Sequence, residues 1–250
     1  MEVVNEIKTE KPNEGATLRL LQINVYVDEK QIVNDFNLTI RQSELHVLMG
    51  PNGSGKSTLI YGILKHPRYR FEGKILLDDE DISKLSTDEL ANRGITATFQ
   101  SPMDLEDIKL RQLLWNIAKK NMNAKEFNDA LNKFLQKLKF DSDILTRGNF
   151  SGGEKKRIEL LQMLFLKPKF LFVDEIDSGV DVDNLKLIAK IINELKANTG
   201  ILLITHYSRI LEYLDVDYVH LYNKGKIIKS GTKDFAYEIE KQGYEKFLLN

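Results

Sequence analysis

The stretch GPNGSGKST, residues 50–58, decides the fold, because it fits the pattern G-x-x-x-x-G-K-[ST] in the setting that this pattern needs. The compact apolar run ELHVLM before it is typical of a buried strand, and a helix is expected after it. Glycines allow the backbone N–H groups of such a loop to point at phosphate oxygens, and the helix adds its positive end. The alternative is a glycine-rich turn with a chance lysine, and the flanking elements disfavour it.

Every residue of this phosphate loop is a candidate ligand of a nucleotide. Lys56 is expected to reach the β- and γ-phosphates, and the Ser57 hydroxyl is expected to coordinate Mg²⁺. The predicted cofactor-binding residues of the loop are Gly50, Pro51, Asn52, Gly53, Ser54, Gly55, Lys56, Ser57 and Thr58.

A phosphate loop also needs a carboxylate on a neighbouring strand, and the run FLFVDE supplies Asp174 and Glu175. An apolar run that ends in two acids places them at the carboxyl edge of the sheet, where α/β proteins bind ligands. Asp174 suits the Mg²⁺ shell, and Glu175 can orient or deprotonate a water in line with the γ-phosphate. Alone, the pair could be a solvated strand end; together with the phosphate loop, the catalytic interpretation is favoured.

The stretch NFSGGEKKR, from Asn149, predicts a helix that begins in an unusual way. Ser151 and Glu154 form a capping box, so Gly152 and Gly153 fall in the first turn. Each glycine in a helix costs roughly 1 kcal/mol relative to alanine. The pair therefore indicates that something approaches this helix end too closely for a side chain.

The order of elements predicts an α/β fold with a mostly parallel sheet. Residues 18–40 alternate apolar and polar side chains around the turn DEK, which indicates an N-terminal antiparallel β subdomain. Residues 105–140 have helical periodicity and no glycine, which indicates an inserted helical lobe. The predicted organisation is a flexible extension (1–17) and a single domain (18–250), with a core (18–100 and 166–250) and a lobe (101–165).

Composition excludes cysteine-based chemistry and disfavours nucleic-acid binding. The chain has 36 Lys and Arg against 37 Asp and Glu, so no global basic field would hold nucleic acid. It contains no cysteine, which excludes a cysteine nucleophile and thiolate ligation of a metal or cluster by these residues. The apolar runs fall far short of the roughly 20 residues that span a bilayer. We therefore expect no membrane insertion, no nucleic-acid partner and a cytoplasmic location.

Taken together, GPNGSGKST, Gln100 after a strand, FSGGE, FLFVDE, SGVD and ITH resemble an ABC-type ATPase cassette of the P-loop NTPase class, in the same order. The resemblance implies ATP as the nucleotide and a homodimer of cassettes formed on ATP binding. It also implies roles for Gln100 as a ligand of metal and water, Asp181 as the D-loop acid and His206 as the switch histidine, making Glu175, His206 and Gln100 the catalytic residues. Finally, it implies that Ser151, Gly152, Gly153 and Glu154 bind the γ-phosphate of a nucleotide held by another copy.

Within this family, FSGGEKKR and THYSRIL…DYVH resemble SufC, the ATPase subunits of iron–sulfur cluster assembly machines. That resemblance implies a SufB- or SufD-like scaffold as partner, docked near the loop after Gln100. Two alternatives remain, a transporter subunit with the same chemistry and a nucleic-acid-binding cassette, which usually has two cassettes or a coiled-coil insertion.

Two positions depart from the usual cassette pattern. Val27 stands where many cassettes have an aromatic residue that stacks on adenine. Glu154 replaces a glutamine, and Lys155 and Lys156 either offset its charge or form a solvated face.

Overall fold

The computed structural model describes residues 15–98, 109–147 and 149–248. Its larger sheet has six strands in the order β10-β9-β3-β8-β7-β6, and all neighbours are parallel except β10, which is antiparallel to β9. The predicted mostly parallel sheet is thereby confirmed. Its strands are β3 (Leu45–Met49), β6 (Ile95–Thr98), β7 (Phe170–Asp174), β8 (Gly200–Ile204), β9 (Tyr218–Asn223) and β10 (Lys226–Gly231).

The N-terminal part forms a separate antiparallel sheet in the order β2-β1-β4-β5, as predicted. Asp28 and Glu29 make its first turn, with φ of 46° and 65°. The first strand begins at Thr17, one residue before the predicted start, and the main-chain N–H of Ala16 bonds the Gln42 side chain just before it. The strands are β1 (Thr17–Val27), β2 (Lys30–Arg41), β4 (Arg70–Leu77) and β5 (Glu80–Asp81).

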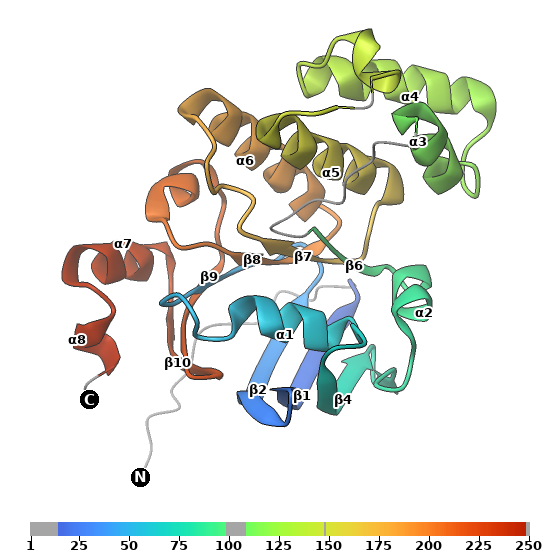
Figure 1. Ribbon diagram of the computed structural model, residues 1–250. Coiled ribbons are helices and arrows are strands. Elements are labelled where there is room, and N and C mark those ends of the chain that lie inside the picture. The colour runs from blue at the N-terminus through green and yellow to red at the C-terminus, as the bar shows by residue number, and fades with distance from the viewer. Residues whose placement is uncertain (1–14, 99–108, 148, 249–250) are drawn as a thin grey trace.

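The six-stranded sheet is buried on both faces. Figure 1 shows α1 (Lys56–Ile63) between the two sheets, while α5 (Gly152–Leu166) and α6 (Val182–Lys196) cover the opposite face. Along β7, Phe170 and Phe172 pack into the core that contains α1, and Leu171 and Val173 pack into the core that contains α5 and α6. Because side chains alternate along a strand, this explains why β7 reads as a continuous apolar run.

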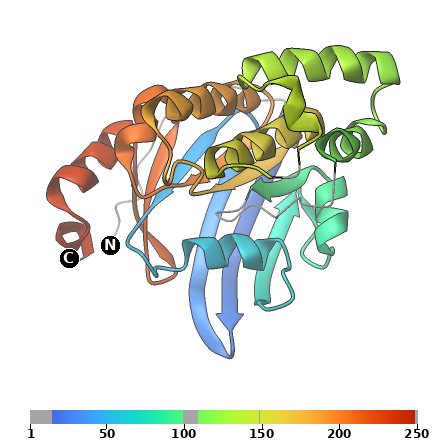
Figure 2. The same cartoon turned by 45° about the horizontal axis from the view of Figure 1, so that its top comes forward.

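The predicted helical lobe is present, and Figures 1 and 2 place its green helices beyond one end of α5, away from the blue antiparallel strands. It contains α3 (Leu110–Ala118), α4 (Ala124–Lys137) and a 3-10 turn (Ser142–Leu145). Asn123 caps α4 by accepting the N–H of Glu126. The first predicted boundary between core and lobe, at 100/101, lies outside the described residues, and the second, at 165/166, falls at the end of α5, which packs on the sheet. The remaining helices are α2 (Thr87–Asn92), a 3-10 turn (Ser208–Tyr213), α7 (Lys233–Gln242) and α8 (Glu245–Leu248).

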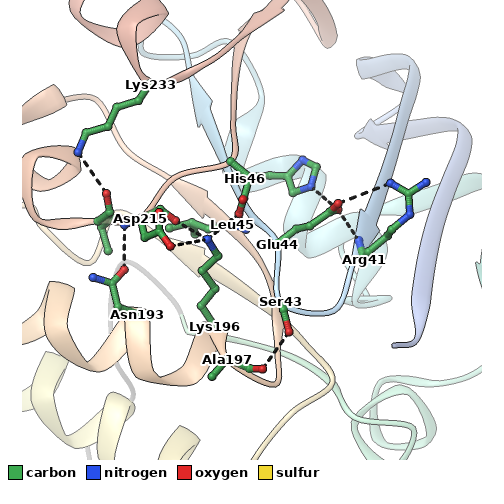
Figure 3. Close-up of polar contacts among 12 residues, drawn as sticks. Arg41, Ser43, Glu44, Leu45, His46, Asn193, Lys196, Ala197, Asp215 and Lys233 are labelled. Atoms are coloured by element: carbon green, nitrogen blue, oxygen red, sulfur yellow. Dashed lines mark hydrogen bonds and ion pairs between the residues drawn. The ribbon is translucent and has the colours of Figure 1, made fainter. Parts of the chain in front are cut away.

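A polar cluster fixes the amino-terminal edge of the sheet, opposite to the edge that carries the phosphate loop. Figure 3 shows Lys196 reaching from α6 toward Asp215 and the start of β3. The Lys196 ammonium is 2.8 Å from Asp217 Oδ2 and 3.2 Å from Asp215 Oδ2, and Asp217 also accepts the N–H of Leu45 at 2.7 Å. The end of α6 and the entries of β3 and β9 are therefore held together.

Two buried histidines on β3 and β9 contact each other beside this cluster. His46 Nδ1 lies 3.0 Å from His220 Nε2, and His46 Nε2 lies 3.1 Å from the Glu44 carboxylate (Figure 3). The hydroxyl of Ser230 is 2.8 Å from His220 Nδ1. Burial and the neighbouring His46 lower the pKa of His220 to about 3, so this imidazole is neutral near pH 7.

Candidate active site

A cavity of about 810 Å³ lies at the carboxyl edge of the parallel strands. The phosphate loop, the acids after β7 and the histidine after β8 meet there, which is the clustering that the sequence predicts. Asp177, Ser178, Tyr207 and Tyr244 also line it and were not predicted. The lining residues are Pro51, Asn52, Gly53, Gly55, Lys56, Ser57, Thr58, Glu175, Asp177, Ser178, His206, Tyr207 and Tyr244.

The backbone of the phosphate loop requires glycine at two places. A Cβ on Gly50 would lie 2.0 Å from the Tyr222 carbonyl oxygen. Gly55 has φ of 101°, where other residues are strained, and a Cβ there would lie 2.9 Å from Ile32. Gly55 leads directly into α1, so the loop ends at a helix N-terminus that favours an anion.

Lys56 is bonded within its own loop. Its ammonium donates to the carbonyls of Gly50 at 2.9 Å and Pro51 at 3.0 Å. Burial lowers the pKa of Lys56 to about 8, against the opposing effect of the nearby Glu175 and Asp174 carboxylates. To bind a phosphate, the ammonium would have to exchange these carbonyls for phosphate oxygens.

Asp174 and Ser57 form an oxygen donor set. Asp174 is on the same face of β7 as Phe172, directed at α1, where a hydrogen bond joins it to the Ser57 side chain. Asp174 Oδ1 is buried and has no hydrogen-bond partner among the described residues. Burial raises the pKa of Asp174, and the bond with Ser57 partly opposes this. A hydroxyl and an orphaned carboxylate oxygen fit a hard cation such as Mg²⁺. The third predicted ligand, Gln100, lies outside the described residues.

Glu175 and His206 contact each other directly. Strands β7 and β8 are parallel neighbours with Asp174 opposite Ile204, so the residues after their ends meet. Glu175 Oε1 lies 2.6 Å from His206 Nε2. The backbone of Glu175 has φ of 48°, in the left-handed region, and its N–H bonds the Ile204 carbonyl at 3.0 Å. The two predicted catalytic side chains are thus held together at the cavity wall.

The loop after β7 is tied down by buried polar groups. Asp177 accepts the Thr205 hydroxyl at 2.7 Å, and burial raises the pKa of this carboxyl. Lys156 donates to the Glu175 carbonyl at 3.3 Å and to both the carbonyl and the hydroxyl of Ser178. Asp177 and Ser178 could have been found from their place directly after the acidic pair. Lys156 carried no local signal.

Neither sequence-based alternative named Arg147, which pairs with Glu154 in the structure. Its Nη2 is 2.7 Å from Glu154 Oε1. Lys156 is buried, with 8% of its surface exposed, so it is not part of a solvated face. The helix turns Lys156 inward because it lies on the face that also buries Leu160 and Met163.

The helix start at NFSGGE forms as predicted. The N–H of Ser151 donates to Glu154 Oε2 at 2.8 Å, and the N–H of Glu154 donates to the Ser151 hydroxyl at 3.3 Å. A Cβ added at Gly152 or Gly153 would meet nothing within 4 Å. Within the described part of this chain, therefore, no contact explains the two glycines. The described residues that line the cavity include none from this helix start.

Asp181 caps the next helix. Its carboxylate accepts the N–H of Asn184 at 2.9 Å, which places Asp181 at the N-cap of α6. Hydrogen bonds from the Asn184 main chain and side chain lower the pKa of Asp181. The described cavity lining does not include Asp181.

The profile of one protein family, described as "ABC transporter", matches residues 33–178. The chain belongs to this family. Relatives of similar length include "Probable ATP-dependent transporter ycf16" of Antithamnion sp., 40% identical over 93% of this chain and 98% of the relative. "Vegetative protein 296" of Bacillus subtilis (strain 168) is 38% identical over 92% of this chain and 93% of the relative.

Solved structures of ABC cassettes have the same fold. A nucleotide-free ATP-binding cassette from an ABC transporter is 26% identical, with a TM-score of 0.74 over 92% of this chain and 96% of the other. The ADP conformation of another such cassette is also 26% identical, with a TM-score of 0.75 over 94% and 99%. The chain is therefore an ATP-hydrolysing ABC enzyme that binds a nucleotide. Across the described ranges, the search for helices that could span a membrane found none.

Proposed function

We propose that this ABC ATPase is the motor subunit of a SUF-like iron–sulfur cluster assembly complex, in which ATP-dependent dimerisation changes the conformation of a SufB- or SufD-like scaffold. The observation that carries this is the resemblance of FSGGEKKR and THYSRIL…DYVH to SufC. Several residues of these two sequence stretches make specific contacts in the structure or line the cavity. Glu154 pairs with Arg147, Lys156 bonds the loop after β7, and Tyr207 stands at the cavity with 59% of its surface exposed.

The proposed dimer would complete each nucleotide site. One copy would contribute the cavity lined by its phosphate loop. The other would contribute Gly152 and Gly153, which present bare N–H groups at a helix N-terminus with open space around them. Such a helix end attracts an anion. In the dimer, Ser151 to Glu154 of one copy would face the γ-phosphate held by the other copy, and Asp181 would lie at the same interface.

Within each site, Ser57, Asp174 and Gln100 would hold Mg²⁺, which neutralises developing phosphate charge when bound. Glu175 would leave its contact with His206 to orient the attacking water, and His206 would contact the γ-phosphate. Lys56 would bind the β- and γ-phosphates. Positioning and charge stabilisation then account for catalysis without a covalent intermediate.

The absence of cysteine from all 250 residues supports a division of labour. These residues offer no thiolate to a cluster, so the cluster would be assembled on ligands of the scaffold. The predicted docking segment, residues 101–112, falls largely outside the described residues, so its place at the scaffold stays a prediction.

The second candidate is the ATP-binding subunit of an ABC membrane transporter. The names of the ycf16 relatives, ATP-dependent transporters, favour it, and it uses the same ATP site. The two candidates differ in the partner. A SUF-like complex has a soluble scaffold that carries iron and sulfide, and a transporter has a polytopic membrane protein.

The experiment is anaerobic affinity purification of the tagged chain from its native cells. The Glu175→Gln variant should trap the ATP-bound state, and Lys56→Ala is the matched control that cannot load ATP normally. We expect a soluble partner with bound iron and sulfide, recovered in different amounts with the two variants. Recovery of a polytopic membrane protein instead would establish the transporter alternative.

A further inference from the structure

His206 stands in a short segment whose two ends are buried and hydrogen-bonded. Thr205 and Ser208 are 0% and 4% exposed, whereas the two residues between them, His206 and Tyr207, line the cavity. The Thr205 hydroxyl bonds Asp177 at 2.7 Å and accepts the N–H of Tyr207 at 3.1 Å. The position of the histidine therefore depends on how the two ends of this segment are held.

The second end is held from the C-terminal part of the chain. The Ser208 hydroxyl donates a hydrogen bond to a carboxylate oxygen of Glu240, on α7. Ser208 begins the 3-10 turn that follows His206, so this bond fixes the chain two residues after the histidine. The family profile matches residues 33–178 and includes neither partner of the bond. Glu240 therefore reaches this segment through the tertiary fold.

Helix α7 is itself fixed on the 3-10 turn. Apolar side chains of the two elements share one buried core, namely Phe235, Ile239, Ile210 and Leu211. At the start of α7, the Lys233 ammonium donates to the Leu214 carbonyl at 3.2 Å. Because packing and this bond hold the helix, Glu240 is presented to the segment from a fixed backbone.

We propose that Glu240 is a positioning residue for ATP hydrolysis, which acts through His206 by holding Ser208 at the end of the segment that carries the histidine. His206 Nε2 lies 2.6 Å from Glu175 Oε1, so a displaced segment would change the contact between the two predicted catalytic side chains. The phosphate loop lies between β3 and α1, so nucleotide binding should depend on Glu240 much less than turnover does. This inference rests on the proposed role of His206 in hydrolysis and not on the identity of the partner.

The test uses three variants of this hydrogen bond and one control. Glu240→Ala removes the acceptor, Glu240→Gln keeps an acceptor oxygen on a side chain of the same length, and Ser208→Ala removes the donor. Glu238→Ala is the matched control, because Glu238 is exposed on the same helix and its carboxylate makes no hydrogen bond or ion pair within the described residues. For each purified full-length chain, kcat, KM and Kd for ATP are measured, and thermal melting verifies folding at the assay temperature.

For Glu240→Ala and Ser208→Ala we expect kcat to fall roughly two- to tenfold, the usual net effect of one hydrogen bond on an equilibrium constant. Kd for ATP should stay at the wild-type value, and Glu240→Gln should recover most of the lost turnover. Glu238→Ala should behave as the wild type. An unchanged kcat in Glu240→Ala, or an equal loss in Glu238→Ala, would overturn the proposal.

The double variant of His206→Ala with Glu240→Ala separates positioning from a merely structural role. If Glu240 acts through His206, the double variant should have the kcat of His206→Ala alone, because no histidine remains to be positioned. A structural role would lower kcat by the same factor in both backgrounds and would refute the proposal. Normal turnover of His206→Ala would remove His206 from the mechanism and this inference with it. Low turnover of His206→Ala together with normal turnover of Glu240→Ala would refute this inference alone.

Discussion

Replacing Gly152 and Gly153 together by alanine should make this ATPase more stable and less active. An added Cβ at either position meets nothing within 4 Å, so alanine introduces no clash in the isolated chain. Glycine costs up to about 1 kcal/mol relative to alanine inside a helix and less near its ends. The double variant should therefore gain up to about 1.5 kcal/mol of unfolding free energy. For a chain of this size, the thermal midpoint should rise by up to roughly 6 °C.

The activity should change in the opposite direction, because two methyl groups would occupy the space that the γ-phosphate of the other copy needs. We expect ATP turnover to be lost and ATP-dependent dimers to disappear, while the isolated chain still binds nucleotide. Thermal melting without nucleotide, steady-state ATPase assays and size-exclusion chromatography with ATP in the Glu175→Gln background measure the three effects.

Gly62→Ala is the matched control for the stability measurement. Gly62 lies within α1, and a Cβ there would be 2.4 Å from Val25 Cγ2, so the same substitution should lower the thermal midpoint. Two results would refute the reasoning about the signature glycines. A lower midpoint for the double variant would mean that the fold itself needs them, and unaltered ATPase activity would mean that nothing approaches them.

Three further perturbations address the catalytic, binding and stability roles of single ionisable groups. Glu175→Gln should lower ATP turnover by about 10²–10⁴-fold because the attacking water loses its base, while ATP still binds and closed dimers accumulate. Single-turnover kinetics measure the loss of turnover, and size-exclusion chromatography measures the dimers. Near-normal turnover would remove Glu175 from the mechanism. The pKa of Lys56 is lowered to about 8, so its charge is present below that pH and lost above it. Kd for ATP should then rise by up to about tenfold per pH unit above that value. In Lys56→Arg, Kd should not change with pH over this range. A wild-type Kd that stays constant up to pH ~9.5 would contradict the argument. The pKa of His220 is depressed to about 3, so the unfolded chain takes up a proton that the folded chain refuses as pH falls below its ordinary value of 6.5. Its contribution to unfolding free energy should fall by about 1.4 kcal/mol per pH unit below that value, as urea titrations can measure, and the same acid slope in His220→Asn would assign the loss to other groups.

Local sequence patterns were sufficient to predict most of the fold. The alternation from Thr17 to Arg41, the helical periodicity of the lobe and the apolar runs around the acidic pair each act over a few residues, so they can be read from the sequence. The first strand begins at Thr17, one residue before the predicted position, because Thr17 pairs with Arg41 at the far end of the next strand.

The candidate site shows the same division. The sequence determined the phosphate loop, the acidic pair, the histidine and the capped helix with two glycines, because each is a short motif whose chemistry depends on near neighbours. Only the tertiary structure decided that Lys156 is buried under the loop after β7 and that Tyr244 lines the cavity. These contacts join segments that meet because the sheet aligns the ends of its strands and the C-terminal helices pack back onto it. Side chains so far apart in the chain, in positions without periodicity, leave no local signal.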